Sequence, residues 1–123
     1  MSILQAPDGP THDLGGTRFT TLATPSLGTS ENAVWLVEID PGPATPHRVT
    51  REEMFVVLDG IAATVIGGRP GQARPGDVVV VPAHTEFEIA NAGADGGLRM
   101  LCCMPVGGEA VTADGRFTPP WAA

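Results

Sequence analysis

The segment "GPATPHRVTREEMFVVLDG", residues 42–60, decides the fold of this chain because it holds a strand followed by a tight turn. Side chains alternate between the two faces of a strand, so Phe55 and Val57 share a face with Glu53. The dipeptide Asp59-Gly60 follows, and between two apolar runs it is typical of a β-hairpin. We therefore expect a hairpin here, with one carboxylate on an otherwise apolar face.

Strand patterns continue along the chain, and no segment has the sustained apolar spacing of an amphipathic helix. The expected strands are residues 16–24, 32–40, 52–60, 61–68, 72–74, 77–83, 86–92 and 98–105. The 16 glycines and 12 prolines suit short strands joined by turns. The sequence therefore predicts a single all-β domain over residues 1–123, with about eight to ten strands in a closed or double-sheet architecture. Residues 1–15 are expected to be an irregular lead-in and residues 106–123 a C-terminal tail.

Two of the expected strands carry apolar side chains on both faces. In "EMFVVL", residues 53–58, only Glu53 interrupts the apolar pattern, and "VVVV" at residues 78–81 has no polar side chain. A strand of a single barrel should have one face toward solvent. Either another part of the chain or a second subunit is therefore expected to cover the outer face, and we favour a homodimer.

Composition excludes several classes of partner. The formal net charge is -7 and no basic stripe is present, so neither nucleic acid nor an anionic membrane surface is an expected partner. No apolar stretch approaches the ~20 residues of a transmembrane helix. Neighbouring residues of a strand point to opposite faces, so Cys102 and Cys103 are expected to be free thiols. Free thiols indicate a reducing compartment, and we expect a cytoplasmic protein.

Residues 42–60 contain His47, Glu53 and Gly60, and residues 76–91 contain Gly76, Pro82 and Asn91. These two segments resemble the two motifs of the cupin family. Residues 42–60 resemble the first motif, with His47 at its first histidine position and six residues between Glu53 and the closing Gly60. Residues 76–91, "GDVVVVPAHTEFEIAN", resemble the second motif, with Gly76, Pro82 and Asn91 in place. This resemblance implies a double-stranded β-helix, or jelly-roll barrel. Functions within the family are diverse, so the resemblance alone does not assign one.

The sequence departs from the family pattern at two positions that usually carry metal-binding histidines. Val49 stands at the second histidine position of the first motif, and Phe87 stands at the histidine of the second. Only His47 and Glu53 remain, and most transition-metal sites use three or more protein ligands. His84 could complete a two-histidine, one-carboxylate set. A divalent transition metal held by His47, Glu53 and His84 therefore stays one alternative, and no cofactor is required.

The residues of the first motif also suggest a small-molecule pocket. A buried carboxylate must be paired or protonated, and extended geometry offers His47 and Arg51 as partners of Glu53. If Arg99 faces outward, Met100, Cys102 and Met104 face the interior. Convergent polar groups in an apolar pocket are the usual sign of a ligand site. The predicted pocket residues are His47, Val49, Arg51, Glu53, Phe55, Phe87, Met100 and Cys102.

Three functional hypotheses follow from this pocket. The first is a protein that binds a small molecule beside a residual His47–Glu53 pair, because Val49 and Phe87 make the cavity more apolar. The second is a metal-dependent oxygenase or isomerase. The third is a metal-free isomerase or cyclase with His47 and Glu53 as its acid–base groups. The chain has no tyrosine, which removes the histidine–tyrosine pairing of metal-free sugar epimerases in the family.

Overall fold

The computed structural model describes residues 2–9, 12–93 and 96–123. Its strands are β1 (His12–Leu14), β2 (Thr17–Ala23), β3 (Asn32–Ile39), β4 (Arg48–Val49), β5 (Glu53–Asp59), β6 (Ala62–Ile66), β7 (Arg69–Ala73), β8 (Val78–Val81), β9 (Phe87–Asn91), β10 (Leu98–Pro105), β11 (Ala110–Thr112) and β12 (Gly115–Phe117). Two 3-10 turns are η1 (Pro25–Leu27) and η2 (Pro120–Ala122). The prediction of an all-β chain is confirmed.

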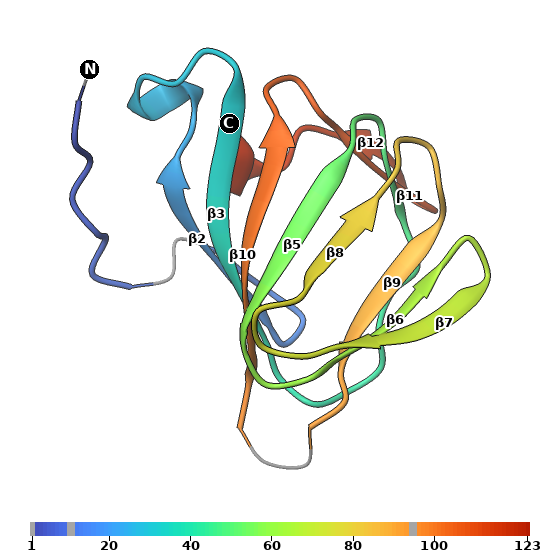
Figure 1. Ribbon diagram of the computed structural model, residues 1–123. Coiled ribbons are helices and arrows are strands. Elements are labelled where there is room, and N and C mark those ends of the chain that lie inside the picture. The colour runs from blue at the N-terminus through green and yellow to red at the C-terminus, as the bar shows by residue number, and fades with distance from the viewer. Residues whose placement is uncertain (1, 10–11, 94–95) are drawn as a thin grey trace.

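The strands form two layers that face each other across a single core (Figure 1). One layer is a six-stranded sheet in the order β1-β2-β3-β10-β5-β8. The other layer consists of the sheets β7-β6-β9 and β12-β11-β4, which an isolated bridge between His47 and Phe87 connects. All pairings are antiparallel between the described strands. This arrangement is the jelly-roll barrel that the two motifs imply.

The long strand β10 confirms the predicted division of faces. Its alternate side chains Leu98, Met100, Cys102 and Met104 are buried, whereas Arg99 is exposed. Strand β5 behaves in the same way, since Glu53 lies on the buried face with Phe55 and Val57. Period-two alternation therefore placed the interior residues of both strands correctly.

The predicted hairpin at Asp59-Gly60 is wrong. Strand β5 pairs with β10 and β8, whereas β6 pairs with β7 and β9 in the opposite layer. The turn instead carries the chain from one sheet to the other. Gly60 has φ +85, and a Cβ at this position would lie 2.9 Å from the Gly97 carbonyl oxygen. The glycine is therefore needed for a sheet-to-sheet corner with close backbone approach, and its local sequence looks the same as that of a hairpin turn.

Regular structure extends beyond the limits that the sequence predicts. Strand β1 lies within the expected irregular lead-in, and β11 and β12 lie within the expected C-terminal tail. The tail ends against its own chain, because the Trp121 ring stacks on the Phe19 ring with centroids 3.6 Å apart. Thr21 Oγ1 also donates a hydrogen bond to the Trp121 carbonyl oxygen at 2.8 Å. Turn η2 therefore packs against the end of the barrel formed by β2 and β3.

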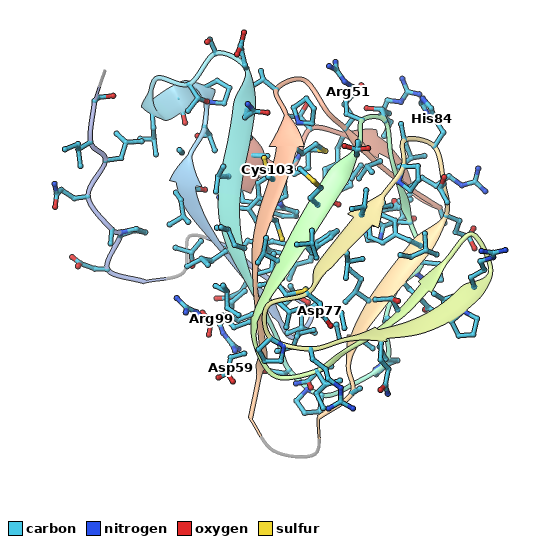
Figure 2. All side chains as sticks on the ribbon, viewed as in Figure 1. Arg51, Asp59, Asp77, His84, Arg99 and Cys103 are labelled. Carbon is cyan, nitrogen blue, oxygen red and sulfur yellow. The ribbon has the colours of Figure 1, made fainter. Side chains whose placement is uncertain are left out.

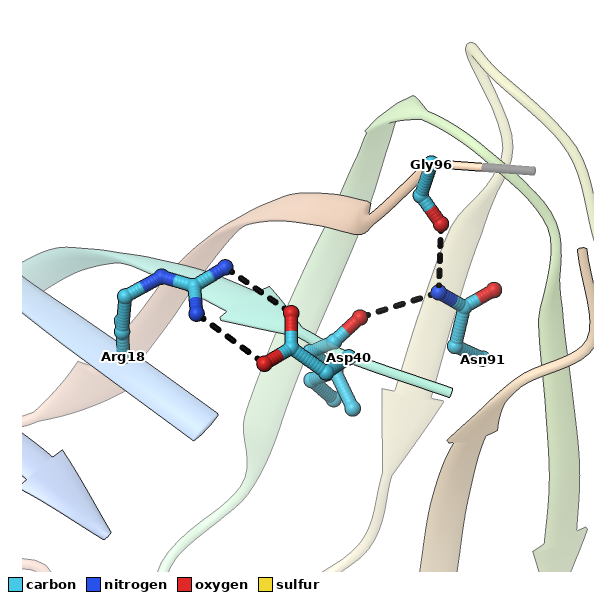
Figure 3. Close-up of polar contacts among 5 residues, drawn as sticks. Arg18, Asp40, Asn91 and Gly96 are labelled. Atoms are coloured by element: carbon cyan, nitrogen blue, oxygen red, sulfur yellow. Dashed lines mark hydrogen bonds and ion pairs between the residues drawn. The ribbon is translucent and has the colours of Figure 1, made fainter. Parts of the chain in front are cut away.

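The asparagine of the second motif has a structural role at the opposite end of the barrel (Figure 3). The Asn91 Nδ2 group donates to the carbonyl oxygens of Ile39 and Gly96, each at 3.0 Å. Beside it, both guanidinium ends of Arg18 donate to the Asp40 carboxylate at 3.1 Å. These contacts fix the end of β3 to the connection between β9 and β10.

Among the described residues, no helix has the length and apolar character needed to cross a membrane.

Candidate functional site

Glu53 is the buried acid of the barrel interior, and its side chain is 6% exposed. It begins β5, where it pairs with Val81 of β8, and shares its face with Phe55. No side-chain hydrogen bond or ion pair to its carboxyl group is found among residues 2–9, 12–93 and 96–123. Burial raises the pKa of Glu53 to about 8. The group is therefore a neutral carboxylic acid at pH 7, able to donate a proton or a hydrogen bond.

Sulfur-containing side chains of β10 share this interior. Cys102 is fully buried, and burial raises the pKa of its thiol well above the usual value. Glu53, once it is ionised at higher pH, raises the pKa of the Cys102 thiol further. The two side chains therefore lie within electrostatic range of each other. Both cysteines are free, as predicted. A protonated thiol and a protonated acid therefore sit together in an apolar environment.

His47 lies at the edge of the interior and is half-buried. Its ring centroid is 4.3 Å from that of Phe87, and its Nδ1 atom is 3.1 Å from the Thr45 carbonyl oxygen. The Phe87 ring in turn is 6.0 Å from the Phe55 ring, on the strand that carries Glu53. An aromatic ring therefore stands beside the imidazole on the side of the barrel interior, and in the described part of the chain no hydrogen bond or ion pair joins His47 to Glu53.

Arg51 does not face the interior, contrary to the expectation that residues 47–53 are one extended strand. Strand β4 ends at Val49, and β5 begins only at Glu53. Thr50 holds the intervening bend, since its N–H donates to the Glu109 carbonyl oxygen at 2.9 Å and its Oγ1 accepts from the Glu109 N–H at 2.9 Å. Arg51 is exposed and points away from the barrel (Figure 2). The extended-strand prediction fails because contacts to a distant loop bend the chain.

His84 sits on an exposed turn near the same end of the barrel (Figure 2). It is the non-glycine residue with positive φ among those described, at +64. Its backbone N–H donates to the Val49 carbonyl oxygen at 2.7 Å, which fixes the turn against β4. The turn thus holds the backbone of His84 in place while its side chain stays in solvent.

The donors of the predicted metal set are not gathered in one place. Among the described residues, no group of three histidine, cysteine, aspartate or glutamate side chains is arranged to hold a metal ion. The His47 ring contacts Phe87, the Glu53 carboxyl is inside the barrel, and the His84 side chain is exposed. These three side chains therefore do not fit a resident transition metal in this conformation.

A glycine loop covers the end of the interior that holds Glu53. Cys103 pairs with Met54, so the register brings Met104 to the end of β10 nearest Glu53. A Cβ at Gly108 would lie 2.5 Å from the Met104 Sδ atom, which shows how closely this loop packs on the methionine. Alternation along the strand predicts the inward position of Met104 correctly but gives no indication of this covering loop. Its available signal was the pair Gly107-Gly108, which favours a tight turn.

Two hollows at the surface of the described residues contain none of the eight predicted pocket residues. One, of about 580 Å³, lies between residues 42–44 and the outward side chains of β6, β7 and β9. The other, of about 470 Å³, lies between the N-terminal segment and residues 22–29. The predicted pocket residues Val49, Glu53, Phe55, Phe87, Met100 and Cys102 are instead buried side chains of the barrel interior.

Comparisons with known proteins agree with this fold. The family model described as "Cupin domain" matches residues 35–104, from β3 to the end of β10. No curated protein sequence matches the chain.

Several solved structures have a similar fold. An RmlC-like cupin from Shewanella frigidimarina is 16% identical with a TM-score of 0.70, over 85% of this chain and 91% of that chain. KdgF from a Halomonas species is 22% identical with a TM-score of 0.69, over 85% and 94%. The polyketide cyclase RemF from Streptomyces resistomycificus is 21% identical with a TM-score of 0.66, over 83% and 73%. At these identities the likeness concerns the fold alone.

Proposed function

The chain belongs to the cupin domain family, and from that premise we propose that it binds a small, mainly apolar molecule within the barrel. Glu53 is its central polar contact, and His47 lies at the edge of the site. The observation that carries this proposal is the Glu53 side chain, which is 6% exposed and whose carboxyl group has no hydrogen-bond partner among the described residues. Such a group costs stability unless something binds it.

The protonation state of Glu53 defines the chemistry of the ligand. A neutral acid donates through its O–H and accepts through its carbonyl oxygen, so it suits a carbonyl, hydroxyl or amide group. The surrounding side chains Val49, Phe55, Phe87 and Cys102 are buried and apolar or weakly polar, and they suit a hydrocarbon body. A permanently anionic ligand would lose its hydration without gaining a partner among these side chains. An uncharged molecule with one polar group is therefore the best match.

Entry of a ligand requires side chains to move, because Glu53 and the apolar side chains around it are buried and line neither of the two surface hollows. Met104 is the flexible filler nearest the Glu53 end, and methionine adopts alternative rotamers at low cost. The loop over it contains Gly107, with φ +90, and Gly108. We propose that this loop opens and that Met104 yields the space that the ligand occupies.

A thermal-shift screen of uncharged amphipathic compounds tests the proposal, followed by calorimetric titration of each compound that raises the melting temperature. Binding should weaken about tenfold or more in a Glu53→Leu variant, because leucine removes both the donor and the acceptor, whereas Glu53→Gln keeps one of each and should bind nearly as well. Arg51→Gln is the matched control, since Arg51 is exposed at the same end of the barrel. Equal binding by wild type and Glu53→Leu would refute a role for the carboxyl group.

A second candidate is metal-free acid–base catalysis, and the pKa of Glu53, raised to about 8, favours it. A carboxylic acid that stays protonated at pH 7 can serve as a general acid in cyclisation or isomerisation. Similar folds include a polyketide cyclase and a sugar phosphate isomerase. Once a ligand is known, turnover should fall above about pH 8, where Glu53 loses its proton. Turnover should be absent in Glu53→Gln, which has no acidic proton to give.

Neither proposed function depends on a metal, because the side chains of His47, Glu53 and His84 are not arranged to hold one. Metal analysis of untagged protein tests this: a metal content that falls in a His47→Ala variant would restore the metal-dependent alternative. We propose in addition that the protein works as a cytoplasmic homodimer, for which two apolar strand faces and two free thiols are the support.

A further inference from the structure

Met104 occupies the part of the barrel interior beside Glu53. Cys103 pairs with Met54 across strands β10 and β5. One step further along the same antiparallel register, Met104 lies opposite Glu53. Residues that oppose each other on antiparallel strands have Cβ atoms about 5 Å apart and present their side chains to the same face. Both side chains are buried, so the methionine takes up the space next to the carboxyl group.

Two other neighbours of Met104 have a small side chain or none. Across β3, Met104 pairs with Ala33, which is also buried. The loop after β10 contributes Gly108, where a Cβ would lie 2.5 Å from the Met104 Sδ atom and 2.7 Å from its Cε atom. An acid, an alanine and a glycine therefore border this region, and one flexible side chain takes up the space that they leave.

The loop that covers Met104 is anchored at both of its ends. The Val106 N–H donates to the Glu31 carbonyl oxygen at 2.9 Å. At the other end, the Glu109 N–H donates to Thr50 Oγ1 and the Glu109 carbonyl oxygen accepts from the Thr50 N–H, each at 2.9 Å. Figure 1 shows this loop and the chain that enters β5 at the same end of the barrel. The second anchor therefore ties the loop to the bend that leads into the strand of the acid.

Two glycines separate the anchors. Gly107 is exposed with φ +90, and Gly108 is buried against Met104. The Gly108 N–H bonds within the loop, to the Pro105 carbonyl oxygen at 3.2 Å. Glycine has a wider choice of backbone conformation than other residues, so movement is concentrated at these two positions. Two residues span at most about 7 Å, and an opening of this width admits one narrow group.

From these contacts we infer that Met104 is the specificity-determining residue of the Glu53 site. It holds the space of the ligand in the free protein, and the volume that it vacates sets the size of the ligand that reaches the acid. Methionine suits this role because its unbranched side chain changes shape at low cost. The ligand class narrows to uncharged molecules with a carbonyl, hydroxyl or amide group on one small ring or a narrow chain. The inference rests on the proposed binding at Glu53 and adds the side chain that selects the ligand.

Met100 provides a matched control on the same strand. It lies on the same face of β10 as Met104 and is fully buried. Its register partners are Val37 of β3 and Val57 of β5, so branched apolar side chains border it in place of the acid. Truncation of Met100 therefore leaves a cavity of the same origin that lies away from Glu53.

Phenol and benzene are the probes, because they differ by one hydroxyl group that Glu53 would bind. Met104→Ala deletes the Cγ, Sδ and Cε atoms, and a deletion of this size in an apolar core leaves a cavity that can hold benzene. In calorimetric titration at about pH 7, phenol should bind Met104→Ala at least about tenfold more tightly than wild type, and more tightly than benzene does. Met100→Ala should show no preference for phenol. Equal phenol affinity in Met104→Ala and wild type, or in Met104→Ala and Met100→Ala, would overturn the inference.

A double variant separates this inference from the proposed function. Glu53→Leu added to Met104→Ala should abolish the preference for phenol over benzene, because the hydroxyl group then has no partner. Tighter phenol binding in Met104→Ala without any preference over benzene, or with a preference that persists in the double variant, would refute the role of Glu53 and leave Met104 as the residue that sets the space. Circular dichroism establishes that each variant is folded. If Met104→Ala is unfolded, Met104→Val and Met100→Val, which delete less volume, take the same comparison with the same outcomes.

Discussion

The ring of Phe87 lies against the ring of His47, with centroids 4.3 Å apart and planes inclined by 49°. The backbones of the two residues also exchange hydrogen bonds of 3.0 and 2.9 Å across their bridge. Residues paired in this way on antiparallel strands present their side chains to the same face. A side chain at position 87 therefore lies beside the imidazole, and an aromatic ring takes a place that a metal ligand could occupy.

Histidines at positions 49 and 87, where this chain has valine and phenylalanine, should create a metal site. A double variant, Val49→His with Phe87→His, would add two imidazoles to the face that carries His47 and Glu53. We expect it to bind Zn²⁺ or Ni²⁺ with micromolar or tighter affinity, because four suitable ligands then share one region. Calorimetric titration with each metal measures this, and the single Val49→His variant serves as the control. Equal affinity in wild type would show that the natural residues already hold metal.

Stability should fall as pH rises from about 5 to 8. The pKa of Glu53 is raised from 4.5 in the unfolded chain to about 8 in the folded protein, so the folded state keeps a proton that the unfolded state releases. Each pH unit within this window then costs up to about 1.4 kcal/mol of unfolding free energy. The loss ends above the folded pKa, where both states are ionised. Urea unfolding at about pH 5.5, 6.5 and 7.5 measures how steeply the free energy of unfolding falls with pH.

The variant Glu53→Gln should flatten this dependence and be more stable than wild type at pH 7.5. Glu52→Gln, at the exposed neighbouring position, should leave the slope unchanged. A wild-type slope that persists in Glu53→Gln would assign the effect to another group.

Replacement of Gly60 should destabilise the fold by more than its backbone conformation alone predicts. Gly60→Ala combines an unfavourable φ of +85 with a Cβ 2.9 Å from the Gly97 carbonyl oxygen. Gly68 has a similar φ of +81 but nothing within 4 Å of its Cβ position, so Gly68→Ala isolates the conformational cost. We expect about 1 kcal/mol for Gly68→Ala and about 3 kcal/mol for Gly60→Ala in urea unfolding. Equal costs would show that the corner relaxes around the new methyl group.

The Asn91 side chain should contribute to stability through its amide donors. Asn91→Asp keeps the size and the acceptor but removes the donors to Ile39 and Gly96, and places a charge beside two carbonyl oxygens. We expect a loss of about 2–4 kcal/mol, because these carbonyls lose their partners in a buried region. Asn32→Asp, at an exposed position, is the control. Chemical denaturation compares the two, and similar small losses would exclude a structural role for the amide.

Alternation along the strands was enough to predict much of the interior from sequence. The buried positions of β5 and β10 follow a period of two, as predicted. The prediction works because residues two apart on a strand point to the same face of the sheet. The family pattern in residues 42–60 and 76–91 gave the jelly roll. Strand alternation and the family motifs are both local patterns, so they can be recognised without knowing which strands pair.

The sequence by itself thus determined the all-β fold, the inward position of Glu53 and the loss of two ligand positions. Only the tertiary structure decided what these residues contact. Arg51 turns outward because Thr50 bonds to Glu109, a residue 59 positions away. Asp59-Gly60 joins two sheets because Gly60 meets the backbone of Gly97. Glu53 remains protonated because no partner reaches it in the interior. In each case the deciding atom comes from a distant part of the chain, and local pattern carries no information about it.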